Sequence, residues 1–324
     1  MIHALAITGP TASGKTALSI EIARILGCEI ICLDSMQIYQ RMSIGTAKAT
    51  AEERALVPHH VLDFLSPTES FSAKAYKEMA MPIARDIVNR GKIPLFVGGT
   101  GLYLSTLIRP DTPEPPESDP EYRRAIEQTL TSEEKKIELW ERLRQIDPRS
   151  AETVHYNNTR RVIRALEVFD ATGMPKSYFD ALSKQKNDQL ELTHVTLDFN
   201  DRENLYRRIN SRVDAMMDDG LYDEVRSLLD DGLLGEHTTA AQAIGYKEMT
   251  DAIFSRCSVE EAAERIKQAS RNYAKRQLTW FRNMEGAHTV YADCADGSMR
   301  NASEIISECI SIFSEAIKNF KANN

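Results

Sequence analysis

Near the N-terminus, four residues have the spacing of a phosphate-binding loop: Gly9, Gly14, Lys15 and Thr16 match G-x-x-x-x-G-K-[ST]. Glycines let the chain turn tightly enough for several backbone N–H groups to converge on one anion. Lys15 adds a full positive charge, the helix expected after the loop adds the positive end of its dipole, and the Thr16 hydroxyl can hold Mg²⁺. The residues predicted to bind a diphosphate or nucleotide are Gly9, Pro10, Thr11, Ala12, Ser13, Gly14, Lys15 and Thr16. The alternative is a glycine turn before a purely structural helix.

Two more side chains follow apolar runs that are typical of buried strands. Asp34 comes directly after Cys28 to Leu33, and Thr100 lies in a glycine run after Ile93 to Val97. In parallel sheets, ligands collect at the carboxyl ends of the strands. Asp34 there is a candidate Mg²⁺ ligand or a base that takes a proton from a nucleophile, although an Asp that caps a turn has the same pattern. Thr100 is a candidate contact to a substrate oxygen, and a simple tight turn is the alternative.

Two basic stretches contrast with an acidic chain. They are TRRVIR, from Thr159 to Arg164, and RIKQASRNYAKRQLTWFR, from Arg265 to Arg282. On a helix, Lys267, Arg271 and Lys275 are four residues apart and form one stripe. The stripe is a candidate contact to a nucleic-acid backbone, and a solvated helix face above core aromatic residues is the alternative.

Strands and helices alternate in the first part of the sequence. Strands are predicted at Ala4 to Ile7, Cys28 to Leu33, Ile93 to Val97 and His194 to Phe199, with helices between them. The fold class is therefore α/β, a parallel sheet flanked by helices, as in P-loop NTPases. The chain after Asp201 has a helical pattern almost to its end.

A charged, helical segment interrupts this α/β pattern. It follows the proline-rich stretch at 110–120 and runs to about residue 186. The predicted domains are a core of residues 1–115 and 190–324, and a helical insertion of residues 116–189.

The composition limits the classes of function. The chain has 324 residues, enough for a full core plus a smaller domain, and no run approaches the length of a membrane span. Its five cysteines form no C-x-x-C pair, which predicts reduced thiols, a cytoplasmic protein and no structural zinc. The N-terminus leads straight into a strand, so we expect no secretory signal. A net charge of −8 argues against indiscriminate nucleic-acid binding but permits a local basic groove.

An ordered series of motifs resembles the bacterial tRNA dimethylallyltransferases, also called tRNA isopentenyltransferases. The resemblance extends along essentially the whole chain. The motifs are GPTASGKT from residue 9, DSMQIY from 34, IGTAK from 44, HH-x-L-D from 59, GGTGLY from 98, TRRVIRALEV from 159, AIGYKEM from 243 and KRQLTWFRN from 275.

The resemblance implies a reaction in which the phosphate is the leaving group. The family transfers the dimethylallyl group of dimethylallyl diphosphate to N6 of adenosine 37, beside the tRNA anticodon, and releases diphosphate with the help of Mg²⁺. In the family the helical insertion grips the anticodon stem-loop. We expect a monomer, because no partner surface is evident in the sequence.

The resemblance also assigns residues. Asp34 matches the catalytic base, Thr100 matches a threonine that contacts the bridging oxygen of the diphosphate, and the leaving-group arginine is Arg208 or Arg212, of which we favour Arg208. The residues that match tRNA contacts are Asp34, Ser35, Met36, Gln37, Thr100, Arg123, Arg160, Arg161, Val162, Ile163, Arg164, Gln242, Ala243, Ile244, Gly245, Tyr246, Lys247, Lys275, Arg276, Gln277, Leu278, Thr279, Trp280, Phe281 and Arg282. Some relatives have Arg-Cys where this chain has Gln242-Ala243. At this expected tRNA contact the chain therefore departs from the family pattern.

Two other classes of function share some of these features. A P-loop kinase of a small metabolite or nucleotide would explain the loop, the Mg²⁺ ligand and the Asp after a strand, but not the basic stretch at 265–282. A non-catalytic RNA-binding protein with a nucleotide switch would explain the basic stretches, and its function would stay intact in an Asp34→Ala variant.

Overall fold

The structure is a computed structural model that describes residues 1–110, 113, 115–182, 188–235 and 238–322. The chain divides into two compact units, the first made of residues 1–108 and 189–324 and the second of residues 109–188. The domain boundaries predicted from the sequence are 115/116 and 189/190. Part of the proline-rich stretch, at 111–112 and 114, and the predicted end of the helical segment at 186 lie outside the described residues.

Unit 1 is built on a parallel sheet with the strand order β3-β2-β4-β1-β5-β6. The strands are β1 (Ile2–Thr8), β2 (Cys28–Leu33), β3 (His59–His60), β4 (Ile93–Gly98), β5 (Leu190–Asp198) and β6 (Ala287–Tyr291). The four strands predicted from the sequence are all present. The prediction that the chain after Asp201 is helical almost to its end was wrong at β6, a short edge strand in which only Val290 is buried.

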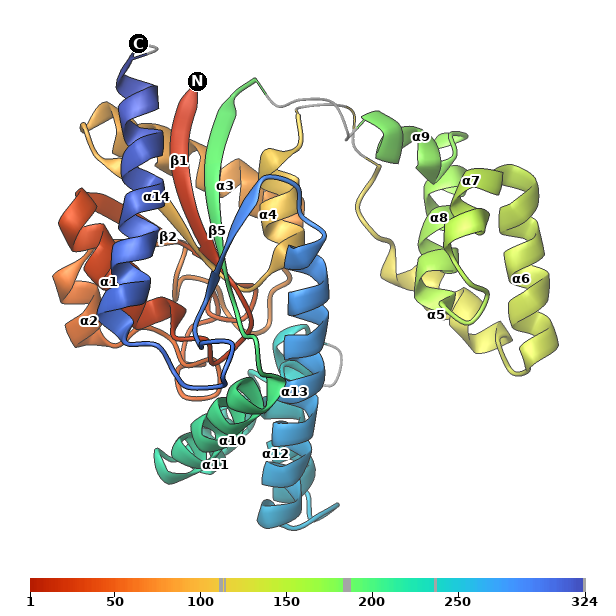
Figure 1. The fold of residues 1–324 in the computed structure, drawn as a ribbon. Coiled ribbons are helices and arrows are strands. Elements are labelled where there is room, and N and C mark those ends of the chain that lie inside the picture. Colours follow the sequence, from red (N-terminus) through yellow and green to blue (C-terminus); the bar gives the residue numbers. More distant parts are fainter. Residues whose placement is uncertain (111–112, 114, 183–187, 236–237, 323–324) are drawn as a thin grey trace. The chain divides into compact units, whose positions relative to one another are not determined.

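Helices cover both faces of this sheet (Figure 1). Helices α1 (Lys15–Leu26) and α14 (Ala302–Ala322) pack on one face, and α3 (Ala73–Asn89) and α4 (Gly101–Ile108) pack on the other. Alternate residues of β1 therefore enter two separate cores. Ala4 and Ala6 lie in the core with α3 and α4, whereas Leu5 and Ile7 lie in the core with α1 and α14. A strand buried on both faces must be apolar throughout, which is why its sequence shows no alternation.

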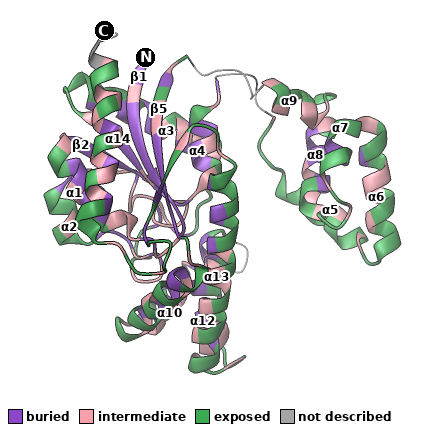
Figure 2. Cartoon of the chain, viewed as in Figure 1, coloured by how far each residue is buried: buried purple, intermediate pink, exposed green. Residues whose placement is uncertain are grey.

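A second group of helices gathers beyond the carboxyl ends of the strands. It comprises α10 (Arg202–Asp218), α11 (Leu221–Asp230), a 3₁₀ turn at Ala240–Gln242, α12 (Tyr246–Ile253) and α13 (Val259–Arg282). Helix α13 packs against α10, α12 and α4. One side of α13 is buried and the other is exposed along its length (Figure 2). The basic stretch of the sequence is therefore an amphipathic helix next to the loops that end the strands.

The remaining helix of unit 1, α2, is short and follows a well-defined cap. It spans Ala51–Leu56, and the Thr50 side chain accepts a hydrogen bond from the Glu53 N–H while the Glu53 carboxylate accepts one from the Thr50 N–H. This reciprocal pair fixes the start of the helix.

Unit 2 is helical, as its charged sequence predicts. Its helices are α5 (Pro120–Thr129), α6 (Glu133–Ile146), α7 (Pro148–Thr153), α8 (Thr159–Thr172) and α9 (Lys176–Leu182). Side chains cap three of these helices at Asp119, Ser132 and Asp147. A small core forms where Leu143 of α6 meets Val162 and Leu166 of α8.

None of the helices in the described part of the chain has both the length and the apolar character needed to cross a lipid bilayer.

Candidate active site

The phosphate-binding loop connects β1 to α1 at the carboxyl end of the sheet. Gly14 has a φ of 89°, a left-handed conformation that glycine adopts without strain, and α1 begins at the next residue. The first N–H groups of α1 therefore face the loop, where a helix attracts anions. The structure thus gives the predicted diphosphate site the backbone geometry that it needs.

Lys15 folds back over this loop. Its Nζ donates hydrogen bonds to the carbonyl oxygens of Gly9 at 3.0 Å and Pro10 at 2.6 Å. Burial of the ammonium and the nearby Arg212 guanidinium lower the pKa of Lys15 to about 7, and the Asp34 carboxylate opposes them. The Lys15 ammonium and the Arg212 guanidinium repel each other in this enclosed site. A bound polyanion would offset that repulsion and would therefore be strongly stabilised there.

Asp34 lies just beyond the end of β2 and has two roles open to it. Its Oδ1 accepts hydrogen bonds from the N–H groups of Met36 at 2.8 Å and Gln37 at 3.3 Å, so it does cap a turn. Its Oδ2 accepts no hydrogen bond from any residue in the described ranges. One oxygen thus orients the carboxylate and the other is left for a substrate.

Thr100 is tied to the loop that follows Asp34. Its Oγ1 accepts a hydrogen bond from the Ser35 N–H at 3.0 Å, and its own N–H donates to the Leu33 carbonyl oxygen at 3.1 Å. The loops at the ends of β2 and β4 therefore form one connected structure. Asp34 and Thr100 are brought together, as the sequence analysis expects for side chains at neighbouring strand ends.

Both arginines of the α10 segment reach the phosphate-binding loop. Arg208 is exposed, and its Nε donates to the Ala12 carbonyl oxygen at 2.8 Å. Arg212 is half-buried and donates to the Thr11 hydroxyl at 2.9 Å and to the Thr46 carbonyl oxygen at 3.3 Å.

The environment of Arg212 distinguishes it from Arg208. Its Nε is buried without a hydrogen-bond partner in the described structure. Burial lowers the pKa of Arg212, and the Asp34 carboxylate opposes that effect. Arg212 is also the cation that acts on the pKa of Lys15. The structure therefore places Arg212 among the charged groups of the site, although the sequence analysis favoured Arg208.

The outer face of α13 carries less free positive charge than the sequence suggested. Lys267 pairs with Asp214 at 2.7 Å and Glu264 at 2.8 Å, so the predicted stripe is neutralised at that end. Lys275 and Arg276 lie over the rings of Tyr206 and Tyr273. No carboxylate within the described ranges pairs with either of them.

Other residues of the same segment are held within the fold. The Arg282 guanidinium pairs through two nitrogens with the Asp198 carboxylate, at 2.7 and 2.9 Å. Gln277, Leu278 and Phe281 are buried, whereas Thr279 and Trp280 are exposed. Side-chain contact with RNA is thus open to Lys275, Arg276, Thr279 and Trp280, and to the exposed part of Arg282, which is already paired with Asp198.

The segment at 242–247 is also divided between surface and core. Tyr246 is fully buried, and its hydroxyl donates to the Glu224 carboxylate at 2.6 Å. Ala243 and Gly245 are buried and Ile244 is half-buried, while Gln242 and Lys247 are exposed. Only the exposed pair can present side chains to a large partner.

In unit 2, the predicted RNA contacts lie on α5 and α8. Arg123 and Arg164 both pair with the buried Glu167 carboxylate, at 3.1 and 2.7 Å. Val162 and Ile163 are buried. The exposed cations of this group are Arg160 and Arg161.

Within the described ranges, no group of three or more His, Cys, Asp or Glu side chains is arranged to hold a metal ion. Oxygen donors at the loop include the Thr16 hydroxyl, which no described side chain engages, and the hydroxyls of Thr11 and Ser13, which bond to Arg212 and Lys15. Such a sparse set suits Mg²⁺, which keeps several waters and takes its remaining ligands from phosphate oxygens.

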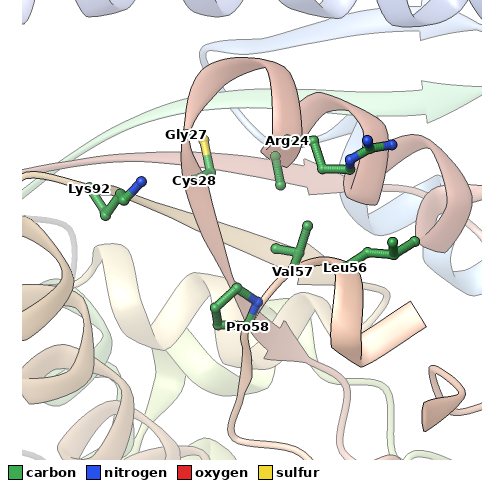
Figure 3. A pocket seen from close by; sticks show the side chains of 8 residues that line it. Arg24, Gly27, Cys28, Leu56, Val57, Pro58 and Lys92 are labelled. Carbon is green, nitrogen blue, oxygen red and sulfur yellow. The ribbon is translucent and has the colours of Figure 1, made fainter. Parts of the chain in front are cut away.

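A shallow pocket lies at the other end of the sheet, where β2 begins (Figure 3). Its lining includes Arg24, Cys28, Val57 and Lys92. Burial raises the pKa of the Cys28 thiol to about 12, which disfavours the reactive thiolate form. The pocket is separate from Lys15, Asp34 and Thr100, which lie at the opposite, carboxyl end of the strands.

Sequence reasoning missed one supporting residue of the site. The Glu224 carboxylate accepts hydrogen bonds from the N–H groups of Ser43, Ile44 and Gly45, and so fixes the loop whose Thr46 carbonyl receives Arg212. The glycine of IGTAK is a local sign of close packing there. No local signal in the sequence points to Glu224 as the partner.

Comparisons with known proteins identify the family to which the chain is similar. A family model described as "IPP transferase" matches residues 37–284, and one described as "isopentenyl transferase" matches residues 2–60. A tRNA dimethylallyltransferase of Geobacillus thermodenitrificans is 49% identical over 280 residues, 86% of each chain. One from Bacillus cereus is 46% identical over 304 residues, 93% of this chain and 92% of that one.

Solved structures give the same result. The tRNA isopentenylpyrophosphate transferase of Bacillus halodurans is 39% identical, with a TM-score of 0.71 over 98% of both chains. A eukaryotic dimethylallyltransferase acting on tRNA is 28% identical, with a TM-score of 0.79 over 98% of this chain and 80% of that one.

Proposed function

The chain belongs to the tRNA dimethylallyltransferase family, and from that premise we propose that it transfers the dimethylallyl group of dimethylallyl diphosphate to N6 of adenosine 37 in tRNA. The observation that carries the assignment of its active site is the meeting of Lys15, Asp34 and Thr100 at the carboxyl ends of adjacent strands.

The phosphate-binding loop holds the diphosphate in this proposal. Backbone N–H groups at the start of α1 and the Lys15 ammonium surround the anion, and their field favours the charge that develops as diphosphate leaves. The same loop in a kinase would hold a nucleotide whose phosphoryl group is transferred. Here the phosphate stays bound and carbon moves.

Asp34 acts as the base. The exocyclic nitrogen of adenine is a poor nucleophile because its lone pair is delocalised into the ring. As the N6–carbon bond forms, the bond between carbon and the bridging oxygen breaks, and Asp34 Oδ2 takes the N6 proton. The Thr100 hydroxyl, which accepts from the N–H of Ser35, the residue after Asp34, contacts the bridging oxygen.

Arg212 supplies further positive charge to the leaving group. Its buried, unpartnered Nε and its contact with Thr11 support this role over one for the exposed Arg208. Arg208 then braces the loop through the Ala12 carbonyl oxygen.

Mg²⁺ is the metal that fits the donors. The Thr16 hydroxyl, which has no side-chain hydrogen bond to any described residue, would hold it together with diphosphate oxygens and water. When bound, it supplies positive charge that stabilises the departing diphosphate.

Two exposed basic surfaces support tRNA as the acceptor. One is formed by Lys275 and Arg276 of α13, with Thr279 and Trp280 beside them, and the other by Arg160 and Arg161 of α8. The target base must leave its stack to reach a buried site, and an exposed Trp280 offers a surface on which a base can stack.

We further propose that the enzyme works as a monomer in the cytoplasm. All five cysteines are free thiols, which supports a reducing compartment.

Mass spectrometry of an unmodified anticodon stem-loop tests the proposed function. After incubation with the enzyme, Mg²⁺ and dimethylallyl diphosphate, we expect the RNA to gain one dimethylallyl unit on the adenosine next to the anticodon. A parallel reaction with ATP and no isoprenoid should leave the RNA unchanged. Phosphoryl transfer from ATP to a metabolite, with no alkylation of RNA, would instead support the kinase.

A further inference from the structure

The side chain of Gln277 joins two loops of the active site that are far apart in the sequence. Its Oε1 accepts a hydrogen bond from the Thr11 N–H at 2.8 Å, and its Nε2 donates one to the Gly99 carbonyl oxygen at 2.9 Å. Gln277 is only 5% exposed, so neither bond is shared with bulk water. One carboxamide on α13 thus fixes the distance between the phosphate-binding loop and the glycine loop.

Helix α13 also explains why the glycine loop contains glycine. A Cβ atom at Gly99 would overlap the amide nitrogen of Gln277, and a Cβ atom at Gly101 would overlap the indole ring of Trp280. Thr100 lies between these two contact points. Its backbone is therefore held from both sides by residues of one helix, while its hydroxyl meets the Ser35 N–H.

We propose that Gln277 is a positioning residue for dimethylallyl transfer, because it sets the spacing between the loop that grips the departing diphosphate and the Thr100 hydroxyl that contacts it. This rests on the proposed function. Gln277 is buried and bonded to both loops, so we assign it a role in positioning them rather than in binding tRNA.

The expected effect of Gln277 on the rate follows from how sensitive the reaction is to displacement of the two loops. Removing the carboxamide leaves the Thr11 N–H and the Gly99 carbonyl buried without partners, and the two loops then shift to recover hydrogen bonds. A displacement of about 1 Å in an active site costs on the order of a hundredfold in rate. The loss should appear in the chemical step, because the surfaces that bind tRNA are not altered.

The test compares Gln277→Leu with Gln268→Leu. Gln268 is a matched control on the same helix, because it is exposed and bonds only to its neighbours Arg271 and Asn272. For Gln277→Leu we expect kcat for dimethylallyl transfer to fall by about tenfold to a hundredfold. The affinity for the stem-loop should stay near that of the wild type, and the thermal midpoint should fall by only a few degrees, as expected for the loss of two buried hydrogen bonds. The control should match the wild type in all three measurements.

Three results would overturn the proposal. The first is a weaker stem-loop affinity with an unchanged kcat, which would make Gln277 an RNA contact. The second is a loss of activity that only follows the fraction of unfolded protein. The third is a wild-type kcat in Gln277→Glu, which decides the matter if Gln277→Leu does not fold. That variant has the same shape and still accepts from Thr11, but it turns a carboxylate oxygen toward the Gly99 carbonyl.

Failure of the proposed function would be a separate result. A wild-type enzyme that alkylates no RNA overturns the assigned reaction, whereas an active wild type with an equally active Gln277→Leu variant overturns only the role of Gln277.

Discussion

The Arg212 guanidinium donates a hydrogen bond to the Thr11 hydroxyl at 2.9 Å, so an arginine of α10 lies directly on the phosphate-binding loop. The contact joins residues 201 positions apart, and it leaves the buried Nε of Arg212 without a partner in the described structure. A diphosphate in the loop would give this nitrogen its missing acceptor.

The first prediction concerns this arginine. Arg212→Gln should lower kcat by about a hundredfold to a thousandfold, because it removes a charge that stabilises the leaving group. Arg208→Gln, the matched variant one turn earlier on α10, should lose far less, since Arg208 is exposed and contacts the loop backbone. Steady-state kinetics with dimethylallyl diphosphate and a stem-loop measure both, and a larger loss at Arg208 would assign the leaving-group role to that residue.

The second prediction separates the two functions of Asp34. Asp34→Asn keeps an Oδ1 that can accept from Met36 and Gln37, so the turn should persist, but it removes the base. We expect kcat to fall by about a hundredfold or more while the stem-loop still binds with wild-type affinity. Asp34→Ala removes both and should in addition loosen the turn. An Asn variant with a near-normal rate would rule out Asp34 as the base.

Much of this site could be predicted because its residues are local in sequence. The strands β1, β2, β4 and β5 are continuous apolar runs, and each of the first three ends in a motif that has its own chemistry. The fold class and the positions of Lys15, Asp34 and Thr100 follow from that pattern. Strand β6 could not be identified in this way, because a single buried residue in an exposed edge strand leaves almost no hydrophobic period.

The orientation of residues on α13 could not be predicted from sequence. The motif at 275–282 contains solvent-facing and core-facing residues together. Gln277 faces inward because its partners are Thr11 and Gly99, and Arg282 is held by Asp198, which is 84 positions away. Such contacts depend on how the chain returns to the sheet. Neither residue spacing nor charge along the helix contains that information.

The third prediction tests the outer face of α13. Replacing both Lys275 and Arg276 with alanine should weaken stem-loop binding and reduce the slope of log affinity against log salt by about one unit per lost phosphate contact. The double variant Lys267→Ala with Arg265→Ala on the same helix is the control, because carboxylates already pair with both residues. The measurement is stem-loop affinity at several salt concentrations. Equal slopes of log affinity against log salt for the wild type and the Lys275/Arg276 double variant would mean that the RNA does not bind at these residues.

The fourth prediction concerns Arg282, to which we assign a role in stabilising the fold rather than in binding RNA. Arg282→Ala removes the cation from the buried Asp198 carboxylate, which keeps a hydrogen bond from the Phe199 N–H. Because Arg282 itself is partly exposed, the free energy of unfolding should fall by about 2 kcal/mol. The companion variant Asp198→Asn with Arg282→Gln removes both charges and should recover part of the loss. Chemical denaturation gives these values. A fully stable Arg282→Ala protein with weakened RNA binding would return Arg282 to the RNA-contact surface.

The fifth prediction comes from a buried histidine beneath the phosphate-binding loop. His194 of β5 lies with its Nε2 at 2.6 Å from the Thr8 hydroxyl and 3.0 Å from the Thr196 hydroxyl. Burial, together with the nearby His288 of β6, lowers the pKa of His194 to about 4 from its ordinary value of 6.5. Between pH 6.5 and 4, His194 is therefore protonated in the unfolded chain but stays neutral in the folded protein. The free energy of unfolding falls as the pH is lowered through this window.

For a shift of this size the loss is at most about 3 kcal/mol by pH 4. His194→Gln cannot titrate, so its unfolding free energy should fall less steeply with decreasing pH than that of the wild type, measured by denaturant titration at several pH values from 7.5 to about 4.5. The exposed His155→Gln variant is the control and should follow the wild-type slope. Identical slopes for His194→Gln and wild type would mean that His194 is protonated as readily in the fold as in the unfolded chain, which its enclosure by Thr8, Thr196 and Phe281 argues against.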